Sequence, residues 1–350
     1  MEYSVIKPLL FKMDPEHAHE LSKRLIHSEA SINAIEFLFG KLRYEDKILE
    51  QRILGSNFKN PLGLAAGFDK KAELIDTIGR FGFGYTEVGT VTIKPQKGNK
   101  KPRLFRFIEE ESLVNSLGFN NPGIESILSN IKKSSRKLPF GVSIGKGRDT
   151  ALDSAMDDYR RLILALGEMP SYIAVNLSSP NTKNLRALQN EAFVSNLLSE
   201  AKSLTKRPLL LKIDPDMRHE DALKICSRAI ENGAAGIIAT NTSIDYTLIN
   251  SRKTNGGISG KLIAEKSLKM LDSLADEFLG DAMIVSVGGI SDAEGAYSRI
   301  KHGATLLQIY TSFIFEGPTV AKKINEGIAS LLRKDGYSNI SDAVGSELKK

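Results

Sequence analysis

The sequence lacks several features, and each absence excludes a class of protein or of site. Its single cysteine, Cys226, excludes an internal disulfide and a metal site built from thiolates alone, and suits a reducing compartment. No stretch approaches the roughly 18 consecutive apolar residues that a membrane span needs. The start of the chain has an early acidic residue and no small-residue cleavage site, which argues against a secretory signal. We therefore expect a cytoplasmic protein that is soluble or attached peripherally to a membrane.

Two nucleotide-binding signatures and a nucleic-acid surface are also missing. No G-x-G-x-x-G follows any candidate strand, and there is no P-loop. The net formal charge is +6, but the densest basic stretch, 94–106, lacks a series of interleaved aromatic residues and is followed at once by Glu109, Glu110 and Glu111. This pattern indicates a solvated loop or a patch near anionic lipid, and no nucleic-acid partner. The His17/His19 pair is too sparse for a metal site.

Eight short apolar runs recur along the chain at fairly regular spacing. They are residues 62–66, 85–89, 140–145, 172–176, 209–213, 236–240, 283–287 and 306–310. Such continuous runs are typical of strands buried on both faces, and amphipathic segments such as 221–233 lie between them. Eight strands that alternate with helices predict an α/β fold, a (β/α)8 TIM barrel. The alternative is an open doubly wound sheet, against which the missing G-x-G-x-x-G argues.

The first 42 residues fall outside this alternation. They predict two short helices, one capped by Asp14 with Ala18, Leu21 and Leu25 on one face, and a strongly apolar one over 32–39. We therefore divide the chain into a helical N-terminal extension, 1–42, and a barrel domain, 43–350. The apolar faces either pack against the barrel or form a lip for an apolar ligand or lipid, and the residues leave both readings open.

Small and polar residues follow the predicted strands, at the end of a barrel where active sites lie. They are Ala66-Gly67, Gly89-Thr90, Ser143, Asn176, Ser178-Ser179, Thr240-Asn241-Thr242, Gly288-Gly289 and Tyr310-Thr311. Small residues let a planar ring and a phosphate approach the backbone, while amides and hydroxyls both donate and accept hydrogen bonds. The strand ends therefore predict a site for a polar, planar ligand.

The ends of the seventh and eighth strands are where barrels commonly hold phosphate on backbone N–H groups. Gly288-Gly289 and Tyr310-Thr311 occupy these positions, and the stretch 256–260 offers a further backbone nest. A Gly-Gly pair alone is more often a tight turn. Two such features at the expected phosphate end favour a phosphate site instead.

Charged and amide side chains at the same end suggest what the rest of the ligand is. Lys212 ends an apolar strand, so its ammonium should point into the barrel mouth and meet an anion there. In a flavin site that anion would be the N1–C2=O edge of the ring, whereas a surface lysine is the alternative. The amides of Asn115, Asn176, Asn181 and Asn241 suit the imide and urea edges of a pyrimidine.

Consecutive motifs over nearly the whole chain resemble those of dihydroorotate dehydrogenases. They are NPLGLAAGFDK, EVGTVTIKPQKGNKKPRLFR, NSLGFNNPG, VNLSSPNT, LLLKIDPD, ATNTS, GGISGKL, SVGGI and LQIYTSFIFEGP. The resemblance implies oxidation of dihydroorotate to orotate in de novo pyrimidine (UMP) biosynthesis, with FMN as the hydride acceptor. The family's first class uses a cysteine as base and its second a serine, and Ser179 stands at that position.

The N-terminal segment DPEHAHEL also resembles the second class, whose two extra helices form a tunnel for a quinone. This implies a peripheral protein at the cytoplasmic face of the cell membrane, in contact with lipid, with a membrane quinone as final electron acceptor and no obligatory protein partner. Of the two rival readings, a soluble enzyme linked to fumarate or NAD is disfavoured by the extension and Ser179. A non-catalytic FMN-barrel binding protein is disfavoured because the base and the lysines are retained.

The motifs carry the family's functional residues onto this sequence. Those implied to hold FMN are Ala65, Ala66, Gly67, Phe68, Asp69, Thr90, Asn176, Lys212, Thr240, Gly260, Gly289, Tyr310 and Thr311. Those implied to hold dihydroorotate or orotate are Lys70, Asn115, Ser116, Leu117, Gly118, Phe119, Asn176, Asn181, Asn241 and Thr242. Lys70 is expected to meet the substrate carboxylate, a charge-assisted contact that neutral amides do not replace. His19 and Arg106 resemble residues that line the quinone tunnel.

The resemblance also implies the chemistry. Ser179 would remove the C5 proton of dihydroorotate while the C6 hydride passes to the flavin, and Thr182 would relay the proton because an unaided serine hydroxyl is too weakly acidic to ionise at neutral pH. Three positions depart from the family. Ser143 replaces an asparagine beside the flavin, where a water would bridge the shorter side chain. Lys71-Ala72 replaces a polar residue plus glycine, and Leu117 replaces a larger side chain.

Overall fold

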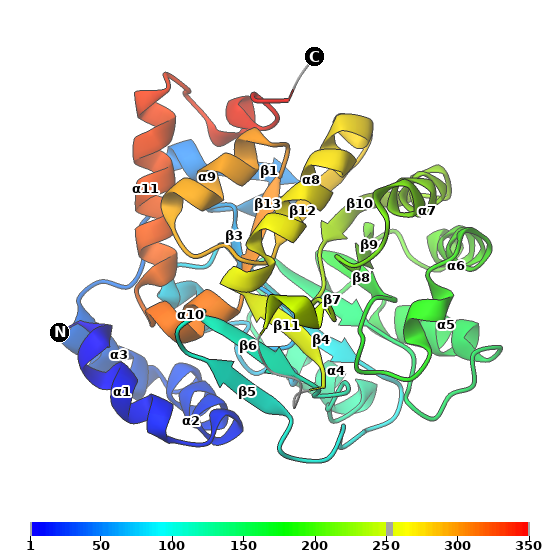
Figure 1. Cartoon of the computed structure of the whole chain (residues 1–350), viewed down its shortest axis with the longest axis horizontal. Helices are drawn as coiled ribbons and strands as arrows, with labels where there is room; N and C mark the ends of the chain where they lie inside the picture. The colour runs from blue at the N-terminus through cyan, green and yellow to red at the C-terminus, as the bar shows by residue number, and fades with distance from the viewer. Residues whose placement is uncertain (1, 250–254, 349–350) are drawn as a thin grey trace.

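The computed structural model describes residues 2–249 and 255–348, and its centre is a closed barrel of eight parallel strands (Figure 1). In chain order the strands are β3 (Leu62–Leu64), β4 (Tyr85–Val91), β7 (Phe140–Ile144), β8 (Tyr172–Asn176), β9 (Leu209–Ile213), β10 (Ala234–Ala239), β12 (Met283–Val287) and β13 (Leu306–Ile309). Each strand pairs with its neighbour along the chain, and β13 pairs with β3 to close the ring. The predicted TIM barrel is confirmed, and each predicted run contains or overlaps one strand.

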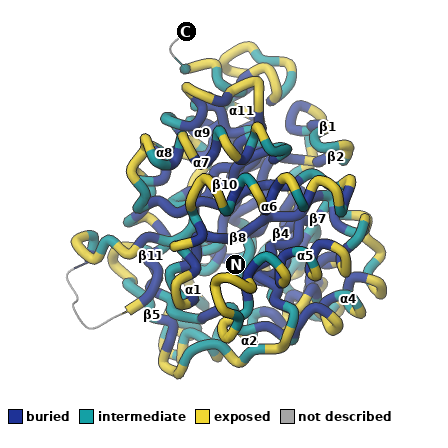
Figure 2. The backbone as a smooth tube through the Cα atoms, turned by 90° about the vertical axis from the view of Figure 1, so that its right-hand side faces the viewer, coloured by how far each residue is buried: buried dark blue, intermediate teal, exposed yellow. Residues whose placement is uncertain are grey.

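Amphipathic helices cover the outside of the barrel. They are α4 (Ile124–Lys133), α5 (Ala155–Leu166), α6 (Glu191–Leu204), α7 (His219–Glu231), α8 (Ala264–Phe278), α9 (Ala293–Lys301), α10 (Thr311–Glu316) and α11 (Val320–Lys334). Short 3-10 helices occur at Lys47–Leu49, Ile78–Phe81, Leu185–Leu188, Tyr246–Leu248, Lys261–Ile263 and Ile340–Ala343. The strands are buried along their length, whereas the outer faces of the helices are exposed (Figure 2). Cys226 is buried on α7, one of these outer helices, and it does not line the cavity at the strand ends described below.

Two small antiparallel sheets that the sequence pattern did not predict lie outside the barrel. A hairpin of β1 (Gln51–Ile53) and β2 (Ser56–Phe58) precedes it. A second sheet has the order β11 (Gly257–Gly260), β6 (Ser112–Asn115) and β5 (Leu104–Phe107). Gly256, directly before β11, lets the chains approach closely, since a Cβ there would lie 2.1 Å from the carbonyl oxygen of Asn115. Most of the stretch predicted to form a backbone nest is therefore a strand.

The N-terminal extension contains three helices rather than two. They are α1 (Tyr3–Lys12), α2 (Pro15–His27) and α3 (Glu29–Phe39). The predicted Asp14 cap is confirmed, because its carboxylate accepts from the N–H groups of Glu16 and His17 at 3.1 and 3.0 Å. The sequence reading missed α1, which contains a helix-breaking residue, Pro8.

Tertiary packing holds α1 in place despite its proline. The Tyr3 hydroxyl donates to the carbonyl of Ile314 at 2.9 Å, and the ring of Phe11 meets that of Phe315 edge to face with centroids 5.2 Å apart. The predicted apolar face of α3 is divided, since Ile32 is fully buried and Phe37 is 89% exposed. The extension therefore packs on the barrel and also presents apolar side chains to solvent.

Candidate active site

A large cavity lies at the carboxyl ends of the barrel strands and brings most of the predicted site residues together. Those that line it are Ala65, Ala66, Gly67, Lys70, Thr90, Asn115, Leu117, Gly118, Phe119, Asn176, Ser179, Asn181, Lys212, Thr240, Asn241, Thr242, Gly260, Gly289, Tyr310 and Thr311. They come from the ends of seven of the eight barrel strands, β7 being the exception, and from the loops that follow. The cavity, counted out to its open mouth, encloses about 1260 Å³ of empty space.

The other predicted residues of the barrel do not line this cavity. They are Phe68, Asp69, Ser116 and Thr182. Asp69 is fully buried, and its carboxylate accepts from the N–H groups of Lys71, Glu73 and Leu74 at 2.8–3.2 Å, so its side chain shapes the loop around Lys70. The backbone carbonyl of Ser116 accepts a hydrogen bond from the side-chain amide of Asn99 at 2.8 Å.

The four predicted amides form two contacts at the cavity. The Asn241 amide donates to the side-chain oxygen of Asn176 at 3.3 Å, and the Asn181 amide donates to that of Asn115 at 3.2 Å. In addition Asn176 donates to the hydroxyl of Thr90 at 3.0 Å. These contacts fix the orientation of each amide and leave further donors and acceptors free to face a planar ligand.

Ser143, the residue that departs from the family pattern, is fully buried beside this network. Its hydroxyl shares a hydrogen bond with that of Thr90 at 2.9 Å, and it does not line the cavity. Ser143 therefore supports Thr90, which does line it. A second departure, Ala72, has a φ of 57°, a left-handed conformation that costs little for glycine and more for alanine.

Lys212 meets a carboxylate that the sequence reading missed. Its Nζ lies 3.7 Å from an oxygen of Glu87, which is fully buried on β4. The hydroxyl of Tyr172 and the amide of Gln308 both donate to the other oxygen at 2.9 Å. Burial and the charge of Glu87 raise the pKa of Tyr172 well above its usual range, so it remains a donor. An acidic residue within the buried run YTEVG was the available signal.

Lys70 lies in a different electrostatic setting, because no carboxylate pairs with it among the residues the structure describes. Burial, with a further contribution from the charge of Lys23, lowers the pKa of Lys70 to about 8. Lys23 itself pairs with Glu73 at 3.7 Å. The cavity therefore presents a lysine that lacks an anion.

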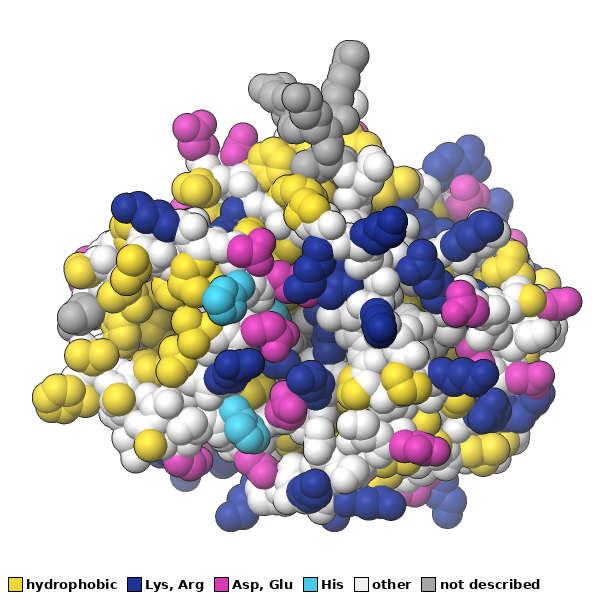
Figure 3. All heavy atoms as spheres, turned by 90° about the horizontal axis from the view of Figure 1, so that it is seen from below, with side chains coloured by type: hydrophobic (Ala, Val, Ile, Leu, Met, Phe, Trp, Pro, Cys, Tyr) yellow, Lys and Arg dark blue, Asp and Glu magenta, His cyan; other side chains and the backbone are white. Residues whose placement is uncertain are grey.

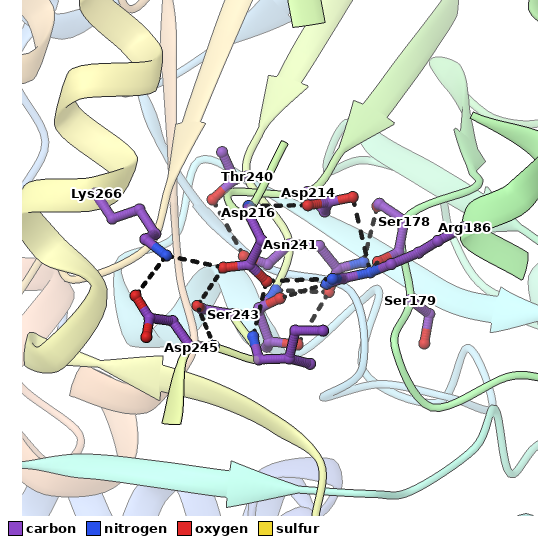
Figure 4. A network of polar contacts seen from close by, with 12 residues as sticks. Ser178, Ser179, Arg186, Asp214, Asp216, Thr240, Asn241, Ser243, Asp245 and Lys266 are labelled. Atoms are coloured by element: carbon purple, nitrogen blue, oxygen red, sulfur yellow. Dashed lines mark hydrogen bonds and ion pairs between the residues drawn. The ribbon is translucent and has the colours of Figure 1, made fainter. Parts of the chain in front are cut away.

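A polar network ties together the loops that carry Ser179 and Thr242 (Figure 4). The Arg186 guanidinium donates to the backbone carbonyls of Ser178 and Thr242, each at 3.0 Å, and pairs with Asp216 at 3.2 Å. Figure 4 shows Ser179 beside this network without a bond to it. Arg186 thus holds the two loops in register and leaves the Ser179 hydroxyl available.

A second, largely apolar cavity lies between the extension and the barrel, and it contains the two predicted quinone residues. It is lined by α1, α2 and α3 on one side and by residues such as Phe68, Phe313 and Ile314 on the other. Leu104 and Leu113 line both this cavity and the polar one, so the two cavities are neighbours.

His19 and Arg106 are the polar side chains of note in the apolar cavity. The His19 ring stacks on that of Tyr310 with centroids 6.2 Å apart, and burial and the charge of Lys70 lower its pKa to about 3, so it is neutral. Arg106 donates to the carbonyls of Leu10, at 3.3 Å, and Met13, which end α1. Arg106 therefore joins α1 to β5.

The outer surface of the extension is apolar around a hollow. Figure 3 shows hydrophobic side chains gathered at the left of the view, over the N-terminal helices. Val5, Leu9 and Phe37 are 66, 69 and 89% exposed. The extension therefore exposes large apolar side chains on one face of the molecule. Over the described ranges, no helix is long and apolar enough to cross a membrane.

Comparison with known proteins identifies the family. Residues 48–332 match the family described as dihydroorotate dehydrogenase. The chain belongs to the dihydroorotate dehydrogenase family. It is 49% identical to the dihydroorotate dehydrogenase (quinone) of Nitratiruptor sp. and 47% identical to that of Helicobacter acinonychis, with 100% of each chain covered in both comparisons.

Solved dihydroorotate dehydrogenase structures have the same fold. A complex of the Eimeria tenella enzyme with ferulenol superposes with a TM-score of 0.87 at 34% identity, over 96% of both chains. The ligand-free form gives 0.87 at 33% identity, over 96% of this chain and all of the other. The family identified from the motifs is therefore confirmed, and with it an oxidoreductase.

The Glu87–Lys212 pair generates a first prediction. Glu87→Gln leaves the Lys212 ammonium buried without its carboxylate, so we expect a double-mutant cycle with Lys212→Met to give a coupling free energy of about 2 kcal/mol for unfolding. Chemical denaturation of the four proteins without bound flavin measures it, because Lys212 is itself expected to contact the flavin. A coupling near zero would show that the two charges do not stabilise each other.

Proposed function

We propose that this chain oxidises dihydroorotate to orotate in pyrimidine biosynthesis and passes the electrons through FMN to a membrane quinone. The observation that carries the proposal is the junction of the two cavities. The cavity at the strand ends has fixed amides and a lysine that pairs with no carboxylate in the described part of the chain, which suits a pyrimidine carboxylate. The apolar cavity suits a quinone. The shared residues Leu104 and Leu113 put the two occupants within reach of one cofactor.

The chain's residues fit FMN at the polar cavity. Gly289 has a φ of 76°, and a Cβ there would lie 2.3 Å from the Cα of Ala264, so the backbone itself forms the cavity wall. Within the described residues, the N–H groups of Gly289 and Ile290 donate to no other group, which leaves them for a phosphate. Lys212, Thr90 and Asn176 would face the ring. FMN supplies the two-electron acceptor for the hydride that leaves C6 of the substrate.

Dihydroorotate would be held by charge and by amide contacts. No carboxylate pairs with Lys70 among the described residues, so Lys70 would bind the substrate carboxylate. The pairs Asn115–Asn181 and Asn176–Asn241 would bind the imide and urea edges. The backbone of 116–119 and Thr242 would complete the pocket. Because each amide is already oriented by a neighbour, little side-chain freedom remains to be lost on binding.

Ser179 would take the C5 proton. It lines the cavity, is 6% exposed, and its hydroxyl accepts only a 3.3 Å contact from the Asn181 N–H among the described residues. A neutral serine must pass the proton on as it takes it. The hydroxyl of Thr182 is buried with no partner in the described part of the chain, so it supports a relay through this residue.

The extension would admit the quinone. His19, neutral and stacked on Tyr310, and Arg106 would offer a polar end to an otherwise apolar tunnel. The exposed residues Val5, Leu9 and Phe37 would sit in a lipid surface as a peripheral contact at the cytoplasmic face of the membrane. An acceptor such as NAD or fumarate would leave the apolar cavity without an occupant. We propose no obligatory protein partner.

The proposed function predicts a spectroscopic result. Purified protein should carry FMN, and anaerobic dihydroorotate should bleach its visible absorbance, because the cavity holds substrate and flavin together. Stopped-flow absorbance measures the rate. Ser179→Ala should slow bleaching at least a hundredfold, while Ser179→Cys, which relays a proton, should retain part of the rate.

Orotate affinity serves as the control, since Ser179→Ala should bind orotate nearly as well as the unaltered protein. Release of FAD, or the absence of any flavin, would contradict the cofactor assignment. Normal bleaching by Ser179→Ala would place the base elsewhere in the cavity.

The apolar cavity predicts a separate effect on reoxidation. Ala18 lines this cavity on α2, so Ala18→Phe should narrow it and slow reoxidation by a hydrophobic quinone about tenfold. Reduction by dihydroorotate, and reoxidation by a small soluble acceptor, should be unchanged. The matched control is Ala30→Phe, an exposed site on α3. Equal quinone rates for the two variants would mean that the quinone does not use this cavity.

A further inference from the structure

Arg299 is a buried arginine outside the cavity whose surroundings are unusual. It lies on α9 and is 4% exposed. Its guanidinium donates to the hydroxyls of Ser286 and Ser267, each at 2.9 Å, and to the carbonyls of Ala264 and Gly288, at 2.9 and 2.8 Å. All of these acceptors are neutral. The guanidinium therefore has several hydrogen-bond acceptors, but none of them carries a negative charge.

No carboxylate lies within ion-pair distance of Arg299 among the residues the structure describes. Asp272, whose charge influences it, instead pairs with His302 at 2.7 Å. Burial lowers the pKa of Arg299 to about 10, so it stays protonated at neutral pH. A buried cation without an anion is costly, and the contrast with the Glu87–Lys212 pair shows that this barrel does place carboxylates beside buried cations elsewhere.

The Gly288–Gly289 peptide links this charge to the cavity. The peptide is trans, so the Gly288 carbonyl and the Gly289 N–H point in opposite directions. Arg299 donates to the carbonyl, so the N–H faces away from the guanidinium, and it has no partner within the described residues. Gly289 lines the cavity. A hydrogen bond to the carbonyl of a peptide polarises its N–H, which makes that N–H a stronger donor to an anion.

We infer that Arg299 is a positioning residue that gives the flavin site its preference for a phosphorylated flavin over an unphosphorylated one. It would act through the Gly288–Gly289 peptide and through its own charge, which the phosphate dianion would compensate. This inference rests on the proposed FMN function. The proposed phosphate site would then include the backbone N–H groups of Gly289 and Ile290, which would touch the ligand, and the side chain of Arg299, which would not.

A purely structural role for Arg299 makes a different prediction. Its four hydrogen bonds also fix the shape of the turn after β12 and its contact with the start of α8. Loss of that shape would displace the Gly289 N–H, so it would lower the FMN preference in every Arg299 variant, Arg299→Lys included. Loss of the charge would lower the preference only in the neutral variants. Comparison of Arg299→Lys with the neutral variants therefore separates the roles.

The experiment is a competition on the full-length holoprotein. Each variant is equilibrated with known mixtures of FMN and riboflavin, and the bound flavins are separated and quantified by chromatography. Arg299→Met, which removes the charge and the donors, should lower the FMN preference at least tenfold. Arg299→Gln, which keeps N–H donors without the charge, should lower it to a similar extent, and Arg299→Lys should stay within threefold of the unaltered protein.

Lys301→Met is the matched control, because it removes a cation from the same helix. Lys301 lies on the outside of the barrel and pairs with Glu347. The control variant should leave the preference unchanged. An unchanged preference in both neutral Arg299 variants, or its loss in Arg299→Lys, would overturn the inference. If the unaltered protein binds riboflavin as readily as FMN, the FMN assignment itself fails before any variant is considered.

Discussion

Positive charge that is buried or half-buried and lacks a carboxylate is the constraint on which the site depends. Lys70 follows β3 and Arg299 lies behind the turn after β12, and in the described structure neither has an ion-pair partner. Under the proposed function, ligand anions would offset this cost: a substrate carboxylate at Lys70 and a phosphate beyond Arg299. Lys212 differs, since Glu87 already balances it. In the described structure, two positive charges at or behind the cavity are therefore not balanced by a carboxylate.

The barrel fold brings these residues together at one end of the molecule. Parallel strands deliver eight loops to one rim, and hydrogen bonds then fix the loops relative to each other. Arg186 joins the loops after β8 and β10, Asp69 shapes the loop after β3, and Arg299 shapes the turn after β12. The N-terminal helices add a second, apolar cavity against the same rim. The two cavities are thus neighbours that share Leu104 and Leu113 as lining residues.

Much of this could be predicted from the sequence. A strand buried on both faces needs a continuous apolar run, so the eight strands were visible, and the residues that follow each run necessarily meet at the rim. The family motifs then supplied roles that spacing alone did not assign. What the sequence did not predict depends on partners far along the chain, such as the pairing of β6 with β11 and the contact of Tyr3 with Ile314.

The sequence did not predict the roles of three charged residues for the same reason. In the sequence alone, Glu87 is an acidic residue within a strand, Arg299 has the pattern of an exposed arginine on a helix, and Arg186 belongs to a polar loop. Only the fold shows what surrounds each of them. Their roles depend on an acceptor or charge that is present or absent in three dimensions. Helix α1 was missed because its packing on α10 outweighs the local cost of Pro8, and no local pattern reports that balance.

The central claim, that an anion completes the buried charge at the cavity, is tested most directly by the pH dependence of ligand binding. Orotate and uracil share the pyrimidine edges, but only orotate has the carboxylate. Lys70 has its pKa lowered to about 8, so it is protonated below that pH and neutral above it. Titrations followed by flavin absorbance from about pH 6 to 9 should show orotate affinity falling above pH 8, by up to about tenfold per pH unit, and weak, pH-independent uracil binding. Equal affinities, or orotate binding that is constant across this range, would contradict the account.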